Sequence, residues 1–434
     1  MKKRMVLKCA WIPAAFLCML PVAAAAADAS ARFVERFDKN NDGKLTVNEF
    51  PRENRRAFRR LDRNQDGVLT VEEHRRERAL LSGFRKEAEE QVERLFKAKD
   101  KDGDGKLARH DVPPWAARNF FKADADGDGV LSWRELTLWR FKLNRRRAMQ
   151  QRSKEAMEPP VPPAFSDVPY GEHEKQRFDI WIPESGKPTP LVIYIHGGGF
   201  RGGDKSRVNG PLIGKLLAEG IGFASMNYRL TDVGPYPMPM HDCARGLQTI
   251  RYRAADFNID PERIGLMGGS AGAGISQWLA FHDDLAESGS PDPVARQSTR
   301  VRCAAPSAAQ CSYDPRFISE LFDSDRVHSA LPAFYGLDSD ADVSNPRFFP
   351  LFEDASPITH LTADDPPVFL YYPQPNEPLP KNSSPQQYIH HPGFGFHLKE
   401  KMDALGIECT LRLREQSPHF PDDEIVAFFR RHLK

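Results

Sequence analysis

The sequence predicts a C-terminal α/β domain, built on a mostly parallel sheet with helices on both faces, preceded by a smaller all-α domain. Three observations predict this architecture. Residues 170–434 alternate short apolar runs with helical segments, one of these runs leads into a glycine-flanked serine, and residues 38–135 repeat an acidic loop four times. The length of 434 residues also favours two domains over one.

Composition and charge are those of a soluble globular protein, with 40% hydrophobic and 28% charged residues. The formal net charge of +1 conceals an asymmetry. Residues 31–160 carry 31 basic and 24 acidic side chains, whereas residues 161–434 carry 26 basic and 35 acidic side chains. Because the arginines of the basic half are interspersed with glutamates, they indicate a solvated helix face, and we expect no nucleic-acid partner.

Residues 1–27 have the features of a secretory signal peptide. Lys2, Lys3, Arg4 and Lys8 precede an apolar stretch, which ends in an alanine run suited to A-x-A cleavage. The apolar stretch is short for a membrane-spanning helix. We therefore expect a secreted or periplasmic protein with no stable membrane insertion.

Four cysteines remain after the expected cleavage, namely Cys243, Cys303, Cys311 and Cys409. They allow three disulfide pairings, among which the sequence does not choose. Cys303 and Cys311 are closest in sequence, and buried free thiols are an equal alternative. The sequence also leaves the oligomeric state open.

An acidic loop recurs four times, starting at residues 38, 62, 100 and 124. Each copy has oxygen-bearing side chains at positions 1, 3, 5 and 12 and glycine at position 6. This pattern resembles the EF-hand calcium loop, which implies up to four Ca²⁺ ions. The implied ligands, including the position-7 carbonyl groups, are Asp38, Asn40, Asp42, Lys44 and Glu49; Asp62, Asn64, Asp66, Val68 and Glu73; Asp100, Asp102, Asp104, Lys106 and Asp111; Asp124, Asp126, Asp128, Val130 and Glu135.

Apolar residues at position 8 of each loop predict that the loops pair through short strands. These residues are Leu45, Leu69, Leu107 and Leu131. Within a pair the loops start 24 residues apart (38 to 62, and 100 to 124), which leaves room for one helix, predicted over 52–61 and over 113–122. A longer helix over 79–97 joins the pairs. Extracellular loops of this type bind calcium at roughly 10⁻⁴ to 10⁻³ M, so a structural or adhesive role is favoured over signalling.

A proline-rich segment marks the predicted domain boundary. A basic helix predicted over 141–157 is broken by Glu158-Pro-Pro-Val-Pro-Pro163, and proline density of this kind is typical of a semi-rigid spacer. The predicted domains are residues 31–157 with the calcium loops, a linker over 158–169, and the α/β domain over 170–434.

The α/β domain alternates strands and helices. Strands are predicted over 177–182, 191–195, 221–228, 264–267, 301–305, 368–372 and 409–414, and helices over 211–219, 241–256, 275–281 and 422–433. Between Ala305 and Pro367 lies a long insertion rich in proline, aspartate and phenylalanine. It is either a partial lid over the active site or a surface excursion.

A strand-turn-helix motif around Ser270 is the centre of this domain. Gly268 and Gly272 bracket Ser270 in a G-x-S-x-G pattern, and the strand at 191–195 ends in His196-Gly-Gly-Gly-Phe200. A glycine loop could instead cradle a phosphate, but the Gly-Lys-Ser/Thr ending of such loops is missing. Together with Asp260-Pro-Glu-Arg-Ile-Gly265, these motifs resemble the α/β-hydrolase superfamily, in the esterase and lipase branch that includes hormone-sensitive-lipase-like and carbohydrate-esterase-like enzymes.

The resemblance, which covers residues 170–434, implies a catalytic triad. Ser270 is the expected nucleophile, and His419 is the expected base because it follows the last strand and precedes the final helix. His390, His391 and His397 compete for this role but precede that strand. The resemblance also implies an oxyanion hole made by the backbone N–H groups of Gly198, Gly199 and Ala271.

The third member of the triad departs from the pattern of the family. Where relatives have Gly-x-x-Asp after a strand, this chain reads Pro373-Gln-Pro-Asn-Glu377. Glu377 is therefore the expected acid, and Asn376 is the alternative, since an amide oxygen can also orient a histidine.

The sequence thus predicts a secreted serine carboxylic-ester hydrolase that works through an acyl-enzyme, needs no cofactor for hydrolysis and carries a calcium-binding module. Export and the family likeness favour acylated polysaccharides as substrates. The alternative is a weak or inactive hydrolase-fold protein that serves as a calcium-stabilised binding or adhesion module.

Overall fold

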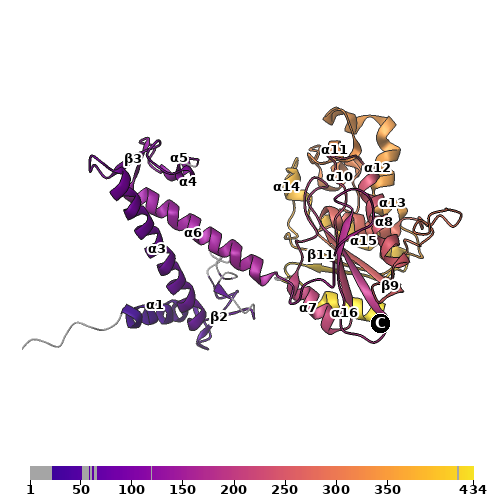
Figure 1. Cartoon of the computed structure of the whole chain (residues 1–434), viewed down its shortest axis with the longest axis horizontal. Coiled ribbons are helices and arrows are strands. Elements are labelled where there is room, and N and C mark those ends of the chain that lie inside the picture. The colour runs from indigo at the N-terminus through magenta and orange to yellow at the C-terminus, as the bar shows by residue number, and fades with distance from the viewer. Residues whose placement is uncertain (1–21, 51–57, 59–60, 63–65, 119, 418–419) are drawn as a thin grey trace, which may run out of the picture. The chain divides into compact units, whose positions relative to one another are not determined.

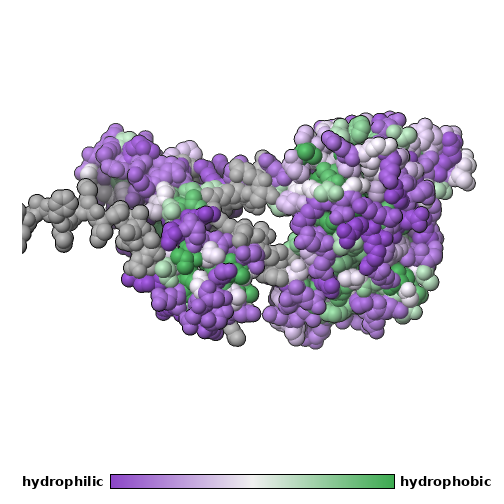
Figure 2. Space-filling view, turned by 90° about the horizontal axis from the view of Figure 1, so that it is seen from below, coloured by the Kyte–Doolittle hydropathy of each residue, from purple (hydrophilic) through white to green (hydrophobic). Residues whose placement is uncertain are grey.

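The computed structural model describes residues 22–434 except 51–57, 59–60, 63–65, 119 and 418–419 (Figure 1). The chain divides into two compact units, residues 1–153 and residues 154–434. The predicted signal peptide lies mostly outside the described residues, and its last residues belong to helix α1 (Val22–Phe37). Every helix in the described part is too short or too polar to cross a membrane. The visible face of each unit is mostly hydrophilic, with apolar residues in small groups (Figure 2).

Paired strands hold the loops of the N-terminal unit together. Strand β1 (Lys44–Thr46) pairs antiparallel with β2 (Val68–Thr70), which sets Leu45 opposite Leu69. Strand β3 (Lys106–Ala108) pairs with β4 (Val130–Ser132) in the same way, with Leu107 opposite Leu131. All four leucines are buried. The predicted pairing of the loops is confirmed.

The helices of this unit depart from the predicted bounds. Helix α3 (Val71–Lys99) begins earlier than predicted, because the Thr70 hydroxyl accepts a hydrogen bond from the Glu73 N–H and caps the first turn. The helix predicted over 113–122 consists of the short helices α4 (Pro114–Ala117) and α5 (Phe120–Ala123). Most of the helix predicted over 52–61 lies outside the described residues. Helix α6 (Trp133–Ala156) covers most of the predicted basic helix.

The C-terminal unit is built on an eight-stranded sheet with the order β12-β11-β10-β9-β7-β8-β6-β5. Strands β7 to β12 run parallel, whereas β6 pairs antiparallel with both β8 and β5. This arrangement confirms the predicted fold class. The strands are β5 (Phe165–Pro169), β6 (Arg177–Trp181), β7 (Thr189–Ile195), β8 (Gly222–Met226), β9 (Ile259–Gly269), β10 (Ala304–Ser307), β11 (Val368–Tyr372) and β12 (Cys409–Leu413).

Helices cover both faces of this sheet because its central strands are apolar on both sides. Val192 packs with residues of α7 (Gly210–Ala218) and α16 (Asp422–Leu433). Its neighbours Leu191 and Ile193 point to the opposite face and pack with residues of α8 (Met238–Tyr252), α9 (Ala271–Phe281) and α15 (Gly393–Ala404).

The predicted linker packs on the C-terminal unit, so its assignment as a spacer over 158–169 was wrong. Strand β5 pairs with β6, and Phe165 packs against Phe257 with ring centroids 5.0 Å apart. Further upstream, the Trp181 indole N–H donates to the Val161 carbonyl at 3.0 Å. Only Phe165 and Val168 give this short segment a strand signal, and β5 forms because it covers the edge of β6.

The four cysteines Cys243, Cys303, Cys311 and Cys409 are buried free thiols. Of the alternatives that the sequence left open, the structure shows the free thiols. Burial raises the pKa of the Cys409 thiol to about 12, which keeps it protonated and unreactive.

The insertion between β10 and β11 folds onto the sheet. It forms α10 (Pro315–Phe322), α11 (Leu331–Tyr335), the 3₁₀ turns η2 (Asp340–Ser344) and η3 (Pro346–Phe348), α12 (Phe349–Ala355) and α13 (Pro357–His360). Phe334 and Phe352 are fully buried in the main core. The insertion is therefore an integral part of this unit.

Candidate active site and calcium loops

Ser270 occupies a strained turn between β9 and α9. Its backbone has φ 53° and ψ −120°, a conformation that L-residues rarely adopt. A Cβ atom on Gly268 would lie 2.4 Å from the Gly272 carbonyl oxygen, and one on Gly272 would lie 2.1 Å from the Ile195 oxygen. Both positions therefore require glycine, as a nucleophile elbow does.

A histidine is in place to activate this serine. The Ser270 Oγ atom lies 2.8 Å from Nε2 of His390. His390 lies between helix α14 (Pro385–Tyr388) and α15. Burial lowers the pKa of His390 below its ordinary value, which favours the neutral imidazole. A neutral imidazole at this distance can accept the hydroxyl proton.

Within the described residues, the histidine in contact with Ser270 is thus His390, one of the competitors of His419 for the role of base. His419, the expected base, lies outside the described residues. His390 was set aside because it precedes β12. The loop between β11 and α15 brings it to the nucleophile nevertheless, and only the adjacent pair His390-His391 ahead of a helix marked it in the sequence.

The structure does not bring Glu377 or Asn376 to His390. The Glu377 backbone carbonyl accepts a hydrogen bond from Nε2 of His391 at 3.0 Å, and the Asn376 N–H donates to the Glu415 carboxylate at 3.1 Å. Within the described parts of the chain, no carboxylate is hydrogen-bonded to His390. The described arrangement is therefore a serine–histidine pair.

A cavity of about 410 Å³ opens over this pair. The expected oxyanion residues Gly198, Gly199 and Ala271 line it together with Ser270 and His390. Gly198 and Gly199 have φ values of 130° and 60°, which strain any other residue, so the loop can present its backbone close to a bound carbonyl. The insertion supplies further walls, namely Gln310, Tyr313, Ile318, His328, Ala330 and Leu331. The insertion therefore contributes to the site, as the lid interpretation expected.

His196, the residue just before the glycine loop, anchors the start of that loop. Its ring is buried and stacks on Tyr228, with centroids 4.5 Å apart and planes 17° apart. The Tyr228 hydroxyl donates to the His196 carbonyl at 3.0 Å. These contacts fix the backbone direction at the start of the loop.

The calcium loops carry oxygen atoms in positions that suit a cation. In loop three, the carboxylates of Asp100, Asp102 and Asp104 lie within 4.8 Å of one another, and in loop four those of Asp124, Asp126 and Asp128 do the same. The first aspartate of loop one accepts the Gly43 N–H at 2.7 Å, which turns the chain back around the acidic groups. Converging carboxylates repel one another without a cation, so these residues fit Ca²⁺. Asn64 lies outside the described residues.

The last acidic residue differs among the loops. Glu49 accepts the Thr46 N–H at 2.9 Å and the Lys39 N–H at 3.2 Å, so its carboxylate reaches across loop one. Glu135 makes the corresponding contacts in loop four. The shorter Asp111 instead has its carboxylate 3.3 Å from His110 Nε2.

Loop three should therefore bind calcium most weakly. We expect Asp111→Glu to tighten that site, because the longer side chain can offer both oxygens to the ion. Calorimetric titration of the wild-type protein and the variant measures this change. The corresponding Glu135→Asp variant should weaken loop four. The prediction fails if loop three is the tightest of the four sites in the wild-type protein.

Comparison with known proteins finds esterase and EF-hand relatives. The BD-FAE family profile matches residues 178–388, and the EF hand profile matches residues 35–52, 55–76 and 120–141. The chain is 27% identical to the probable carboxylic ester hydrolase LipM of Mycobacterium tuberculosis over 48% of this chain and 46% of that protein. It is also 27% identical to the probable isoprenylcysteine alpha-carbonyl methylesterase ICMEL1 of Arabidopsis thaliana. This match covers 58% of this chain and 50% of that protein.

The chain spans about half the length of these curated relatives. Among solved structures, a truncated carbohydrate esterase from gut microbiota matches at 18% identity and a TM-score of 0.49, over 63% of this chain and 99% of that one. Esterase 2 of Thermogutta terrifontis with bound propionate matches at 17% identity and a TM-score of 0.43. This match covers 59% of this chain and 84% of that one.

Proposed function

We propose that this chain, whose C-terminal unit belongs to the α/β-hydrolase superfamily and whose N-terminal unit carries EF-hand loops, is a serine carboxylic-ester hydrolase. The observation that carries the proposal is the 2.8 Å contact between Ser270 Oγ and His390 Nε2, at a cavity that the glycine loop also lines.

In the proposed reaction, His390 accepts the Ser270 proton as Oγ attacks the ester carbonyl carbon. The backbone N–H groups of Gly198, Gly199 and Ala271 stabilise the oxyanion of the tetrahedral intermediate. The C–O bond to the alcohol then breaks, and His390 gives its proton to the leaving oxygen, which leaves Ser270 acylated. Water, deprotonated by His390, attacks the acyl-enzyme, releases the acid and restores the serine.

For the substrate we propose an acyl group carried on a polysaccharide. A second cavity, of about 550 Å³, shares Ile318, Leu331 and Tyr388 with the catalytic cavity, so an ester could place its acyl part in one and a bulky alcohol in the other. The second cavity is also lined by charged groups, which suit hydroxyl-rich ligands: Arg316, Glu320, Asp325 and Arg326. An acetylated oligosaccharide should then give a higher kcat/KM than ethyl acetate, and equal values would exclude a role for this cavity.

The proposal also covers the location of the enzyme and the role of calcium. These rest on the expected signal peptide and on the calcium loops. We place the enzyme outside the cytoplasm, in the periplasm or secreted, where calcium loops of low affinity are filled. Calcium stabilises the N-terminal unit and takes no part in hydrolysis, because the reacting groups all belong to residues of the C-terminal unit.

A fluorophosphonate probe tests the nucleophile. The wild-type protein should form a covalent adduct on Ser270 and hydrolyse short-chain aryl esters, because the probe reacts with a serine that a base activates. Ser270→Ala should lose both the label and the hydrolysis. Mass spectrometry of the labelled peptide identifies the site, and Ser276→Ala, which alters a serine bonded inside α9, is the matched control.

The second candidate function is an inactive, calcium-stabilised binding or adhesion module. The observation that favours it is the missing carboxylate partner of His390 within the described residues. The same experiment separates the two functions, since a folded wild-type protein that takes no label and hydrolyses no aryl ester would be the binding module.

A further inference from the structure

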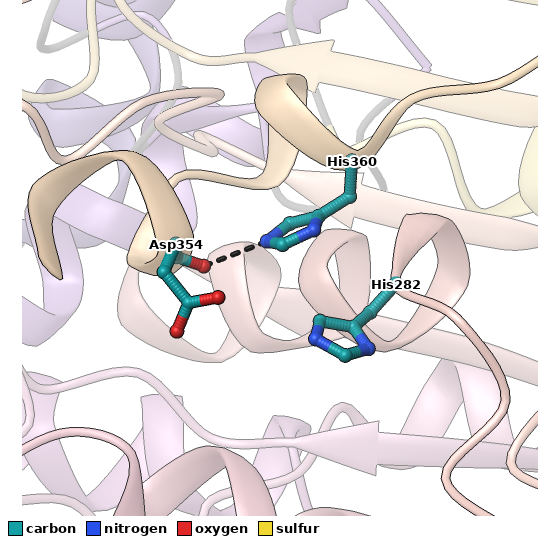
Figure 3. Close-up of side chains that lie close together, drawn as sticks. All are labelled: His282, Asp354 and His360. Atoms are coloured by element: carbon teal, nitrogen blue, oxygen red, sulfur yellow. Dashed lines mark hydrogen bonds between the residues drawn. The ribbon is translucent and has the colours of Figure 1, made fainter. Parts of the chain in front are cut away.

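We propose that His282, Asp354 and His360 form a zinc site at the end of α9 that is remote from the nucleophile. Each residue offers one ligand atom, and these atoms all lie within 4.8 Å of one another (Figure 3). The three residues come from separate elements: His282 follows α9, Asp354 lies in α12 and His360 ends α13. Two imidazoles and a carboxylate are a ligand set that Zn²⁺ takes in proteins.

A backbone carbonyl lies beside one ring nitrogen of each histidine, which favours the tautomer whose other nitrogen can bind a metal. Nε2 of His360 lies 2.7 Å from the Asp354 backbone carbonyl, and Nδ1 of His282 lies 3.0 Å from the Asp283 carbonyl. Because a carbonyl oxygen only accepts, each of these ring nitrogens carries the proton. The other nitrogen, Nδ1 of His360 and Nε2 of His282, keeps its lone pair. Metal-binding histidines are oriented in this way, by donating their second N–H to a carbonyl or carboxylate.

The carboxylate is also held in position. The Tyr236 hydroxyl donates to Oδ2 of Asp354 at 2.6 Å, and its oxygen also lies 3.0 Å from the Asp354 backbone oxygen. The Trp278 indole N–H donates to the same backbone oxygen at 2.9 Å, and the Trp278 ring packs on His282 with centroids 4.1 Å apart. Oδ1 of Asp354 stays available to an ion.

Charge favours a cation at this place. No lysine or arginine of the described residues forms an ion pair with Asp354, whereas its neighbour Glu353 pairs with Arg316 at 2.8 Å. His282 is the C-cap residue of α9, and the C-terminal end of a helix carries partial negative charge. A Zn²⁺ ion would neutralise the carboxylate, and water would supply the fourth ligand of a tetrahedral site.

The geometry gives this site a structural role. Helix α9 has 11 residues and starts next to Ser270, so its two ends lie about 16 Å apart and the ion cannot reach the reacting carbonyl. The ion would instead join the end of α9 to α12 and α13, which belong to the insertion. The inference does not depend on the proposed hydrolase activity.

Zinc titration of the full chain tests the site. The protein is stripped of metals, saturated with calcium to fill the EF-hand loops, and titrated with ZnCl₂ against a chromophoric chelator. The wild-type protein should bind one more zinc ion than the His282→Ala/His360→Ala variant. Co²⁺ in place of zinc should give the intense visible bands of a tetrahedral site, and these bands should be missing from the variant.

Two further variants sharpen the test. Tyr236→Phe removes a hydrogen bond to the carboxylate without removing a ligand, and it should weaken zinc binding about 10–100-fold. His397→Ala, which removes a histidine packed on Phe317 elsewhere in the same unit, should bind zinc as the wild-type protein does.

Thermal melting distinguishes a variant that has lost its zinc ligands from a variant that no longer folds. Without zinc, the double variant should melt somewhat below the wild-type protein, because it loses the packing on Trp278 and the hydrogen bond to the Asp354 carbonyl, and zinc should raise the melting temperature of the wild-type protein only. The proposal is overturned if the double variant binds zinc with the stoichiometry and affinity of the wild-type protein, or if micromolar zinc leaves the wild-type protein unbound.

Discussion

Replacing His390 by alanine should lower kcat for a short-chain aryl ester by about 10⁴-fold or more, because a serine hydroxyl without a base is a poor nucleophile. His390 is the histidine that contacts Ser270, at 2.8 Å. Steady-state kinetics, with the concentration of each enzyme taken from the absorbance of the purified folded protein, measures the effect. KM should change little, since the imidazole acts on the nucleophile rather than on the bound ester.

Two other histidines serve as controls. His391→Ala removes the adjacent side chain, which bonds the Glu377 carbonyl, and should keep kcat within a few-fold. His419→Ala should behave likewise if His390 is the base. A large loss in His419→Ala together with an active His390→Ala would assign the base to His419. Glu377→Gln should leave kcat nearly unchanged, because Glu377 is not hydrogen-bonded to His390.

The pH profile provides an independent check on the same residue. Burial lowers the pKa of His390, so the reactive neutral form persists below the ordinary histidine pKa of about 6.5. In the wild-type enzyme kcat/KM should therefore hold as the pH falls to about 6.5, and should decline only as the pH passes through the lowered value. A decline centred above pH 7 would contradict His390 as the base.

Features set by local chemistry could be predicted from the sequence. Strand β11 (Val368–Tyr372) and helix α16 (Asp422–Leu433) have the predicted bounds, because a continuous apolar run and an amphipathic segment each determine their own structure. The elbow glycines were predictable from the G-x-S-x-G pattern, although only Gly268 is required by a contact within the turn, whereas Gly272 is required by the distant Ile195 oxygen.

Features that depend on the meeting of distant segments could not be predicted in the same way. His390 reaches Ser270 only because the loop after α14 folds over the sheet, and chain order pointed to His419 instead. The group of His282, Asp354 and His360 has no fixed spacing in the sequence, and it forms when α13 packs against α9. Strand β5 was assigned to a linker because its pairing with β6, rather than its own composition, makes it a strand.

Loss of the Asp242 carboxylate should give the largest change in stability. Asp242 is 2% exposed and accepts hydrogen bonds from Arg229 Nε at 2.8 Å and from the Gln176 side chain at 2.9 Å. Asp242→Ala leaves both donors without their acceptor. Removing one partner of a buried pair costs about 3–5 kcal/mol, and we expect the lower end because the Arg229 side chain is 31% exposed.

Urea unfolding followed by loss of ester hydrolysis measures this change in the C-terminal unit alone. Asp364→Ala is the matched control, because Asp364 pairs with Arg300 at 2.8 Å but is 71% exposed, and an exposed pair contributes at most about 1 kcal/mol. The urea midpoint of Asp242→Ala should therefore fall well below that of Asp364→Ala. Equal midpoints would mean that the Asp242 contacts add little to the free energy of unfolding, and that packing alone holds α8 against the sheet.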